Sequence, residues 1–332
     1  MDRRTTALLA VGLALASALF FTSSYVLNRA AANVGGHWAW TASLRYLITL
    51  PLMLPLVHWQ GGMGPVWQAI RARPGAWLGW STVGFVVFYM GLSYAASSGP
   101  SWLVAGTFQL TVVAGTLCAP LLYDDERRRI PWQALVVGLV IVAGVLLMQA
   151  GHGGGIDRAG WVALVVVAIA AFAYPLGNRG LLLHLERNAG RVPELNATQR
   201  VFGLTLASQP AWIVLALYAG AVSGPPPVEQ VWMTAGVAVG AGIIATVLFF
   251  QATGMVRDKP VPLAAAEAMQ GSEILFATVI GVLWLGEAWP SGRSLLGAGL
   301  VIGGIVVFSW IAARSATADE REAKALRSAR GR

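Results

Sequence analysis

Long apolar segments follow one another along almost the whole chain and are separated by short polar connections. A helix that crosses a lipid bilayer needs about 20 predominantly apolar residues. Segments of about that length cover residues 7–27, 38–59, 75–96, 100–122, 132–150, 159–184, 198–220, 229–251, 261–285 and 293–313. The pattern therefore predicts an all-α integral membrane protein with ten transmembrane helices.

The composition agrees with this fold class and excludes others. Hydrophobic residues make up 56% of the 332 residues and charged residues only 11%, whereas soluble proteins contain about 25% charged residues. A soluble domain of this size could not cover its surface with so few charges. The values exclude a water-soluble enzyme and a nucleic-acid-binding domain. We therefore expect a small-molecule substrate and membrane lipid as partners and no nucleic acid, and the oligomeric state stays open.

The distribution of lysine and arginine predicts the orientation, because short cytoplasmic loops carry an excess of these residues. With the N-terminus inside, 17 of them fall in inside segments, and three fall in outside loops, namely Arg29, Arg158 and Arg293. We therefore expect a protein of the cytoplasmic membrane with both termini in the cytoplasm.

An internal repeat becomes visible when the chain is aligned with itself at a shift of 161 residues. Gln109 then falls on Gln270, and Glu126 falls on Glu287. The two glutamates follow span ends, which favours a structural role such as helix capping or pairing with loop arginines.

The repeat divides the chain into a first five-helix half at 1–152, a second five-helix half at 153–313 and a basic tail at 314–332. Five crossings are an odd number, so the second half enters the membrane from the opposite side. Inverted repeats of this kind are frequent in secondary transporters, whose substrate site lies near the midplane between the repeats.

Ionisable groups inside the spans are candidates for the functional site because they are costly in hydrocarbon. The ninth span carries Glu267, Gln270 and Glu273 within an arc of about 120°. Glu273 lies near mid-membrane, where it could exchange protons or serve as a structural acid bonded to a neighbouring helix. Arg45, in the second span, could attract an anionic group, anchor helix packing or extend to the outer interface.

Aromatic side chains could form the walls of a cavity for flat or cationic organic molecules. Tyr89 and Phe88 lie in the third span, and Phe249 and Phe250 lie at the end of the eighth. The alternative for each ring is a lipid-facing or interfacial position. The glycine pair Gly299 and Gly303 could permit close helix approach.

Other kinds of chemistry lack their motifs. The sequence contains no phosphate-binding loop, which argues against direct use of ATP. The single cysteine excludes an internal disulfide and a cysteine-based metal cluster. No catalytic constellation is visible. We therefore expect neither an enzyme nor a bound metal or cofactor.

Several short motifs resemble the ten-helix, EamA-like branch of the drug/metabolite transporter superfamily. They are the pair Arg45–Tyr46, the turn Leu285–Gly286–Glu287 and the stretch 264–273, AAAEAMQGSE. The last is similar to a subgroup labelled as multidrug resistance efflux transporters. Small four-helix pumps of this superfamily rely on a glutamate in the first helix, but residues 7–27 contain no acid. Proton coupling, if present, would then depend on Glu273 or Glu267.

These features together predict a secondary-active exporter of small organic molecules or drugs that works by alternating access, with proton coupling left open. Glu273, Glu267, Gln270, Gln109 and Arg45 are the candidate substrate and coupling residues. One alternative is an uncoupled uniporter or exchanger of amino acids or related metabolites. A membrane enzyme or a structural subunit is the alternative from another class.

Overall fold

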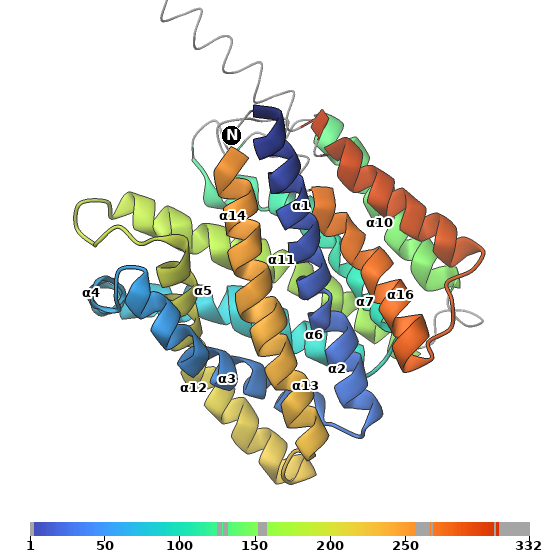
Figure 1. The fold of residues 1–332 in the computed structure, drawn as a ribbon, viewed down its shortest axis with the longest axis horizontal. Helices are drawn as coiled ribbons and strands as arrows, with labels where there is room; N and C mark the ends of the chain where they lie inside the picture. The colour runs from blue at the N-terminus through green and yellow to red at the C-terminus, as the bar shows by residue number, and fades with distance from the viewer. Residues whose placement is uncertain are drawn as a thin grey trace, which may run out of the picture.

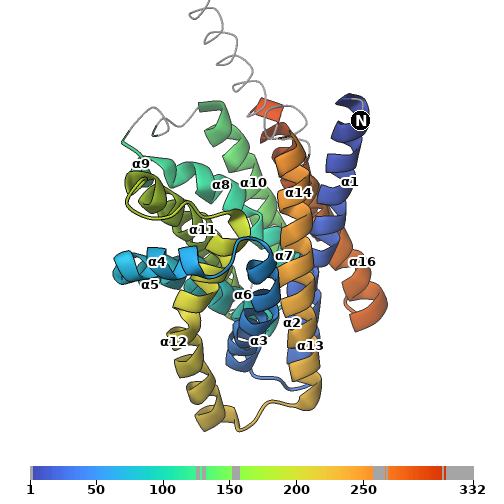
Figure 2. The same cartoon turned by 60° about the vertical axis from the view of Figure 1, so that its left-hand side comes forward.

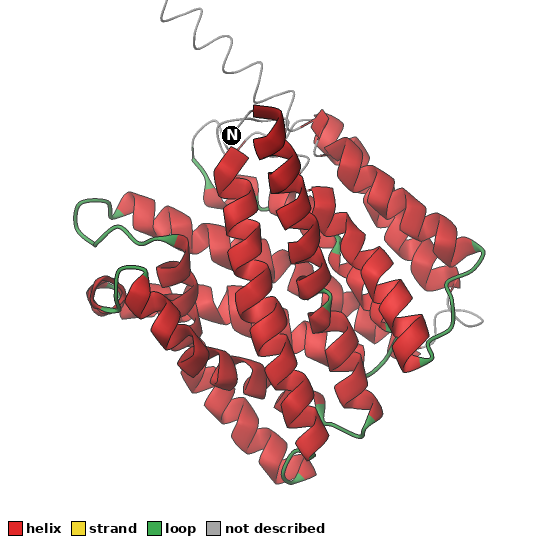
Figure 3. Cartoon of the chain, in the orientation of Figure 1, coloured by secondary structure: helices red, strands yellow, loops and turns green. Residues whose placement is uncertain are grey.

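The structure, a computed structural model, describes residues 3–124, 128, 132–151, 158–256, 266, 268–308 and 310–311. Within these residues the regular secondary structure is helical and contains no β-sheet (Figure 3). Glu267, Glu126 and the tail at 314–332 lie outside the described residues. The predictions made for them stay predictions.

The helices have the lengths and composition of membrane-spanning segments. Six helical segments are long and apolar enough to cross a bilayer: Thr5–Asn33, Trp38–Trp59, Pro74–Ala96, Gly160–Arg187, Ala197–Ser223 and Val228–Thr253. Shorter apolar helical segments are Ser101–Gly115, Leu135–Gly151, Met269–Leu285 and Arg293–Phe308. The outer surface carries leucines that are more than two-thirds exposed, namely Leu139, Leu217 and Leu283. Exposed apolar side chains of this kind suit contact with lipid.

The elements up to residue 151 include several interrupted helices. They are α1 (Arg3–Phe21), α2 (Ser23–Asn33), α3 (Trp38–Trp59), α4 (Gly64–Ala72), α5 (Pro74–Ser81), the π-helical turn η1 (Thr82–Val87), α6 (Phe88–Ala96), α7 (Ser101–Phe108), α8 (Leu110–Leu117), α9 (Ala119–Leu122) and α10 (Trp132–Gly151). Between α1 and α2, the Thr22 hydroxyl donates to the carbonyl of Ala18 at 2.8 Å, a type of bond that often bends helices. The segment 100–122, expected as one helix, is broken at Gln109 and Cys118.

The later part of the chain contains longer helices. They are α11 (Arg158–Arg187), α12 (Ala197–Ser223), α13 (Val228–Val239), the π-helical turn η3 (Gly240–Ala245), α14 (Thr246–Val256), the 3₁₀ turn η4 (Met269–Ser272), α16 (Glu273–Leu285) and the helix Arg293–Phe308. Asn196 and Gln199 begin α12 with a capping box, in which each side chain accepts a hydrogen bond from the other's backbone N–H. Gly286 ends α16 in the left-handed region at φ 66°.

Helices that are far apart in the sequence pack against one another. Figures 1 and 2 show α1 beside α14, and the same kind of contact joins α3 to α12, α6 to α11, and α7 to α16. The core therefore forms between elements that are far apart in sequence.

Glu287 ties one of these distant pairs together. Its carboxylate accepts a hydrogen bond from the backbone N–H of Ser101 at 2.7 Å and another from the Ser101 hydroxyl at 2.8 Å. Ser101 is the first residue of α7, whose unpaired N–H groups favour a negative charge. The carboxylate thus has the capping role suggested by the sequence, but on α7 instead of the helix that follows it.

Glycines allow the closest helix contacts. A Cβ atom on Gly177 of α11 would overlap the backbone of Gly84 in η1, and a Cβ on Gly297 would lie 2.5 Å from the Gly144 carbonyl oxygen. The predicted pair Gly299 and Gly303 makes no such contact, because no other atom lies within 4 Å of a Cβ at either position. The helix Arg293–Phe308 approaches α10 through other glycines on a different face.

Candidate functional site

Glu273 is buried inside the bundle and has a tyrosine partner. It is the first residue of α16, and 5% of its surface is exposed. The Tyr25 hydroxyl on α2 donates a hydrogen bond to Glu273 Oε2 at 2.8 Å. This bond joins the start of the chain to the ninth apolar segment at a buried position.

Arg45 also lies inside the bundle, with 8% of its surface exposed. Its guanidinium carbon lies 3.9 Å from the ring centroid of Tyr89 and 5.1 Å from that of Tyr46. Both distances are within the range of cation–π attraction. Arg45 Nη1 is buried and has no hydrogen-bond partner among the described residues. The arginine is therefore held by aromatic side chains, and its Nη1 is left without an acceptor.

Asn28 connects the arginine end to the glutamate end. The Tyr89 hydroxyl donates to Asn28 Oδ1 at 3.0 Å, and Asn28 Nδ2 is buried without a partner. Asn28 and Tyr25 are three residues apart on α2, so their side chains lie on the same face of that helix. We call Tyr25, Asn28, Arg45, Tyr89 and Glu273 the polar cluster.

Aromatic rings form the walls beside the polar cluster. Phe88 packs on Tyr174 at 4.7 Å and on Phe108 at 5.3 Å between ring centroids. On another side, Tyr46 stacks on Trp212 at 4.6 Å with an interplanar angle of 5°. Residues from α3, α6, α7, α11 and α12 thus surround the cluster with polarisable apolar surface.

The other candidate residues have different positions. Gln109 is 3% exposed, lies at the break between α7 and α8, and directly follows Phe108. Gln270 lies in the 3₁₀ turn before Glu273, and its Nε2 is buried without a partner. Phe249 packs against Phe21 of α1 at 6.4 Å between ring centroids. The side chain of Phe250, like Glu267, is outside the described structure.

The sequence pattern pointed to Arg45, Tyr89 and Glu273 of the polar cluster but not to Tyr25 and Asn28. The spacing of a tyrosine and an asparagine on one face of the first span was the available signal. Among the described residues, no three His, Cys, Asp or Glu side chains come together as metal ligands.

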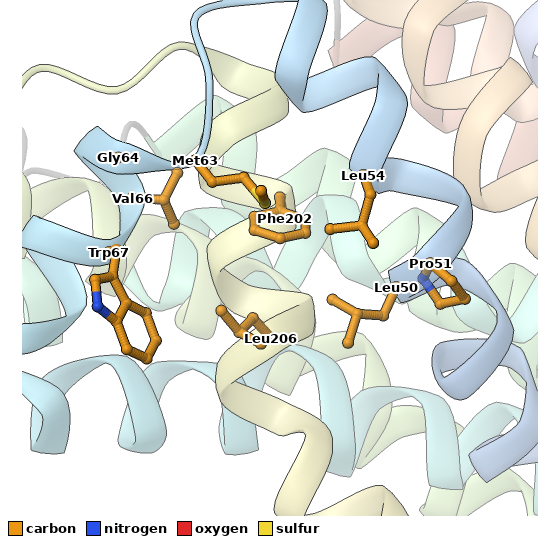
Figure 4. Close-up of a pocket in the computed structure, with 9 residues that line it drawn as sticks. All are labelled: Leu50, Pro51, Leu54, Met63, Gly64, Val66, Trp67, Phe202 and Leu206. Carbon is orange, nitrogen blue, oxygen red and sulfur yellow. The ribbon is translucent and has the colours of Figure 1, made fainter.

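An apolar pocket of about 540 Å³ lies apart from the polar cluster, between α3, α4 and α12 (Figure 4). No charged side chain lines it. Its lining residues are Leu50, Pro51, Leu54, Met63, Gly64, Val66, Trp67, Phe202 and Leu206. The pocket therefore offers aliphatic and aromatic contact surface.

A family model covers nearly the whole chain. The EmrE model, described as "Putative multidrug resistance efflux transporter", matches residues 8–314. The chain belongs to the EmrE family. The apolar helices and this membership agree that the protein is an integral membrane protein of a transporter family.

Two bacterial relatives of this EmrE family member are similar over most of their length. "Uncharacterized protein YjlA" of Bacillus subtilis (strain 168) is 40% identical over 311 residues, which are 91% of this chain and 94% of the relative. "Uncharacterized 42.1 kDa protein in intracellular alkaline protease 3'region" of Shouchella clausii is 40% identical over 275 residues, 81% of this chain and 71% of the relative.

A solved crystal structure has the same fold. It covers 94% of this chain and 99% of its own chain with a TM-score of 0.59, at 16% sequence identity. At that identity the similarity concerns the fold alone.

Proposed function

We propose that the protein is a secondary-active exporter of small organic molecules or drugs, and that it works by alternating access with the polar cluster as its central site. Membership of an efflux transporter family supports the class of function. The observation that carries the site is the hydrogen bond between Tyr25 and Glu273. It places a buried carboxyl group at the junction of α2 and α16, where a movement of either helix would expose or cover it.

The proposed architecture is ten spans in two inverted repeats, at 1–152 and 153–313. Interruptions at matching places support it. The π-helical turns at Thr82–Val87 and Gly240–Ala245 fall in the third and eighth spans, and the breaks at Gln109 and Gln270 fall in the fourth and ninth. The contacts α1–α14 and α6–α11 would exchange under a two-fold axis that relates the halves.

The proposed mechanism assigns a role to each part of the site. Glu273 takes up and releases a proton or a substrate cation, and its exchange is coupled to the making and breaking of the bond from Tyr25. Gln109 and Gln270 offer polar contacts, and Phe88 and Tyr89 form the walls. Glu267, nearer the cytoplasm in the same span, is proposed as a second carboxyl group for coupling. The π-helical turns give places where helices can bend, since such turns are frequent at functional sites.

Transport in proteoliposomes tests this proposal. The purified protein is screened against neutral, cationic and anionic organic solutes, with and without a pH gradient. We expect gradient-driven uphill transport that Glu273→Gln removes, because the amide keeps the shape of the side chain but does not ionise. Exchange between equal concentrations should survive, since it moves no net proton.

The matched control is Glu229→Gln, which changes an exposed glutamate in the first turn of α13. It should behave as the unaltered protein. Unchanged uphill transport by Glu273→Gln would show that another group carries the proton. If transport by the unaltered protein does not depend on the pH gradient, the uniporter or exchanger is favoured. If the solute is chemically altered, an enzyme is favoured.

A further inference from the structure

Two hydrogen-bond donors of the polar cluster have no acceptor. Arg45 Nη1 and Asn28 Nδ2 are both buried without partners among the described residues. The printed side-chain bonds of the cluster run from Tyr25 to Glu273 and from Tyr89 to Asn28 Oδ1, and neither supplies an acceptor to these two donors. An unpaired buried polar group is costly, and an unpaired buried charge is costlier still. The missing component is therefore an acceptor, and a negatively charged one would also neutralise Arg45.

Tyr89 contacts both residues that carry the free donors. The Arg45 guanidinium lies over its ring at 3.9 Å, and its hydroxyl is bonded to Asn28. A guanidinium stacked on a ring keeps the N–H groups of its edge available in the plane of the fork. The Asn28 amide oxygen accepts the bond from Tyr89, and its N–H₂ group is left to donate.

The charge of the site selects among anions. One guanidinium and one neutral amide match a group with a single negative charge and two oxygens, which is the geometry of arginine–carboxylate pairs. A phosphate with two charges would leave one uncompensated among the rings of Tyr46, Trp212 and Phe88. Glu273 is the only acid of the polar cluster, and when ionised it would disfavour a second negative charge.

We infer that Arg45 and Asn28 bind the carboxylate group of the exported substrate, whose apolar part packs on the surrounding rings. That this substrate is exported rests on the proposed function. Its binding can be tested without transport.

The test measures dissociation constants for the purified full-length protein in detergent by isothermal titration calorimetry. The probes are benzoate, phenylacetate and 4-phenylbutyrate, each compared with its primary amide, which has the same shape without the charge. We expect at least one carboxylate to bind ten-fold or more tightly than its amide. If every carboxylate binds within two-fold of its amide, the inference is overturned. Tighter binding of phenylphosphonate than of any carboxylate would overturn the choice of carboxylate.

Variants assign the preference to these residues. Arg45→Gln should bring the ratio of amide to carboxylate dissociation constants close to one. Arg45→Lys keeps the charge but loses the paired N–H groups of the guanidinium, so it should reduce this ratio of dissociation constants several-fold. Asn28→Ala should also reduce it, and this variant decides the question if both Arg45 variants fail to fold. The control is Arg71→Gln, because Arg71 also stacks on a ring, that of Trp67 at 4.9 Å, but at the exposed surface.

The outcomes separate this inference from the proposed function. Carboxylate binding that depends on Arg45, without transport of any solute, would support the site and contradict the exporter. Transport of solutes with no preference for carboxylates over amides would support the exporter and contradict the carboxylate site. A purely structural Arg45 would lower the melting temperature when replaced and leave the ratio unchanged in the variants that fold.

Discussion

At the scale of single residues, the bond from Tyr25 to Glu273 should contribute to stability as well as to function. Tyr25→Phe removes a hydrogen-bond donor to the buried carboxyl group of Glu273 and leaves the ring packing in place. Loss of a partner by a buried polar group costs about 1–3 kcal/mol. We expect a lower melting temperature in detergent and slower gradient-driven transport.

The matched substitution is Tyr218→Phe. Tyr218 is about half exposed and contacts the ring of His37. Removal of its hydroxyl should leave both the melting temperature and transport unchanged. Equal melting temperatures for the Tyr25 and Tyr218 variants would mean that the bond to Glu273 contributes nothing to the folded state.

The sequence predicted the charged members of the site better than the neutral ones. Glu273 and Arg45 could be chosen because a charge in hydrocarbon is costly wherever it lies. Tyr25 and Asn28 carry no charge, and a tyrosine near a span end also fits a membrane interface. Only the packing of α2 against α16 and α6 shows that these two side chains point inward.

At the scale of elements, the contact between η1 and α11 should be intolerant of any added side chain. A methyl group on Gly177 would meet the backbone of Gly84 and the carbonyl oxygen of Trp80, neither of which can rotate away. Overpacking of this kind costs about 1–3 kcal/mol. We expect Gly177→Ala to melt at a lower temperature in detergent than the unaltered protein.

Gly299→Ala provides the comparison, because a Cβ at Gly299 meets nothing within 4 Å. Alanine favours a helix over glycine by about 1 kcal/mol, so this variant should melt at the same temperature or a higher one. If Gly177→Ala were as stable as Gly299→Ala, the close approach of η1 to α11 would be wrong.

The pattern of apolar residues located the helices but not their interruptions. Hydropathy reports only that a segment is apolar, so residues 75–96 and 100–122 each appeared as one helix. The π-helical turn at Thr82–Val87 packs closely on α11, and such packing depends on a helix nearly a hundred residues away. For the same reason, the sequence pointed to Gly299 and Gly303 when the close contact with α10 uses Gly297.

At the scale of the whole molecule, the excess of arginine and lysine in one set of loops predicts the orientation. A fluorescent protein that matures only in the cytoplasm, fused after Arg332, should be fluorescent in cells. A periplasmic phosphatase at the same position should be inactive. The opposite pair of results on well-inserted protein would reverse the proposed orientation.

The pairing of distant helices has a consequence for how the protein is made. Phe21 ends α1 and Thr246 begins α14, the helix that packs beside it. At translation rates of about 5–20 residues per second, the first helix waits roughly 10–50 s in the bilayer before its neighbour is synthesised. Arg45 and Asn28 spend that interval without the later helices that bury them, so the nascent chain passes through a period in which its costliest side chains depend on lipid headgroups, water or the insertion machinery for solvation.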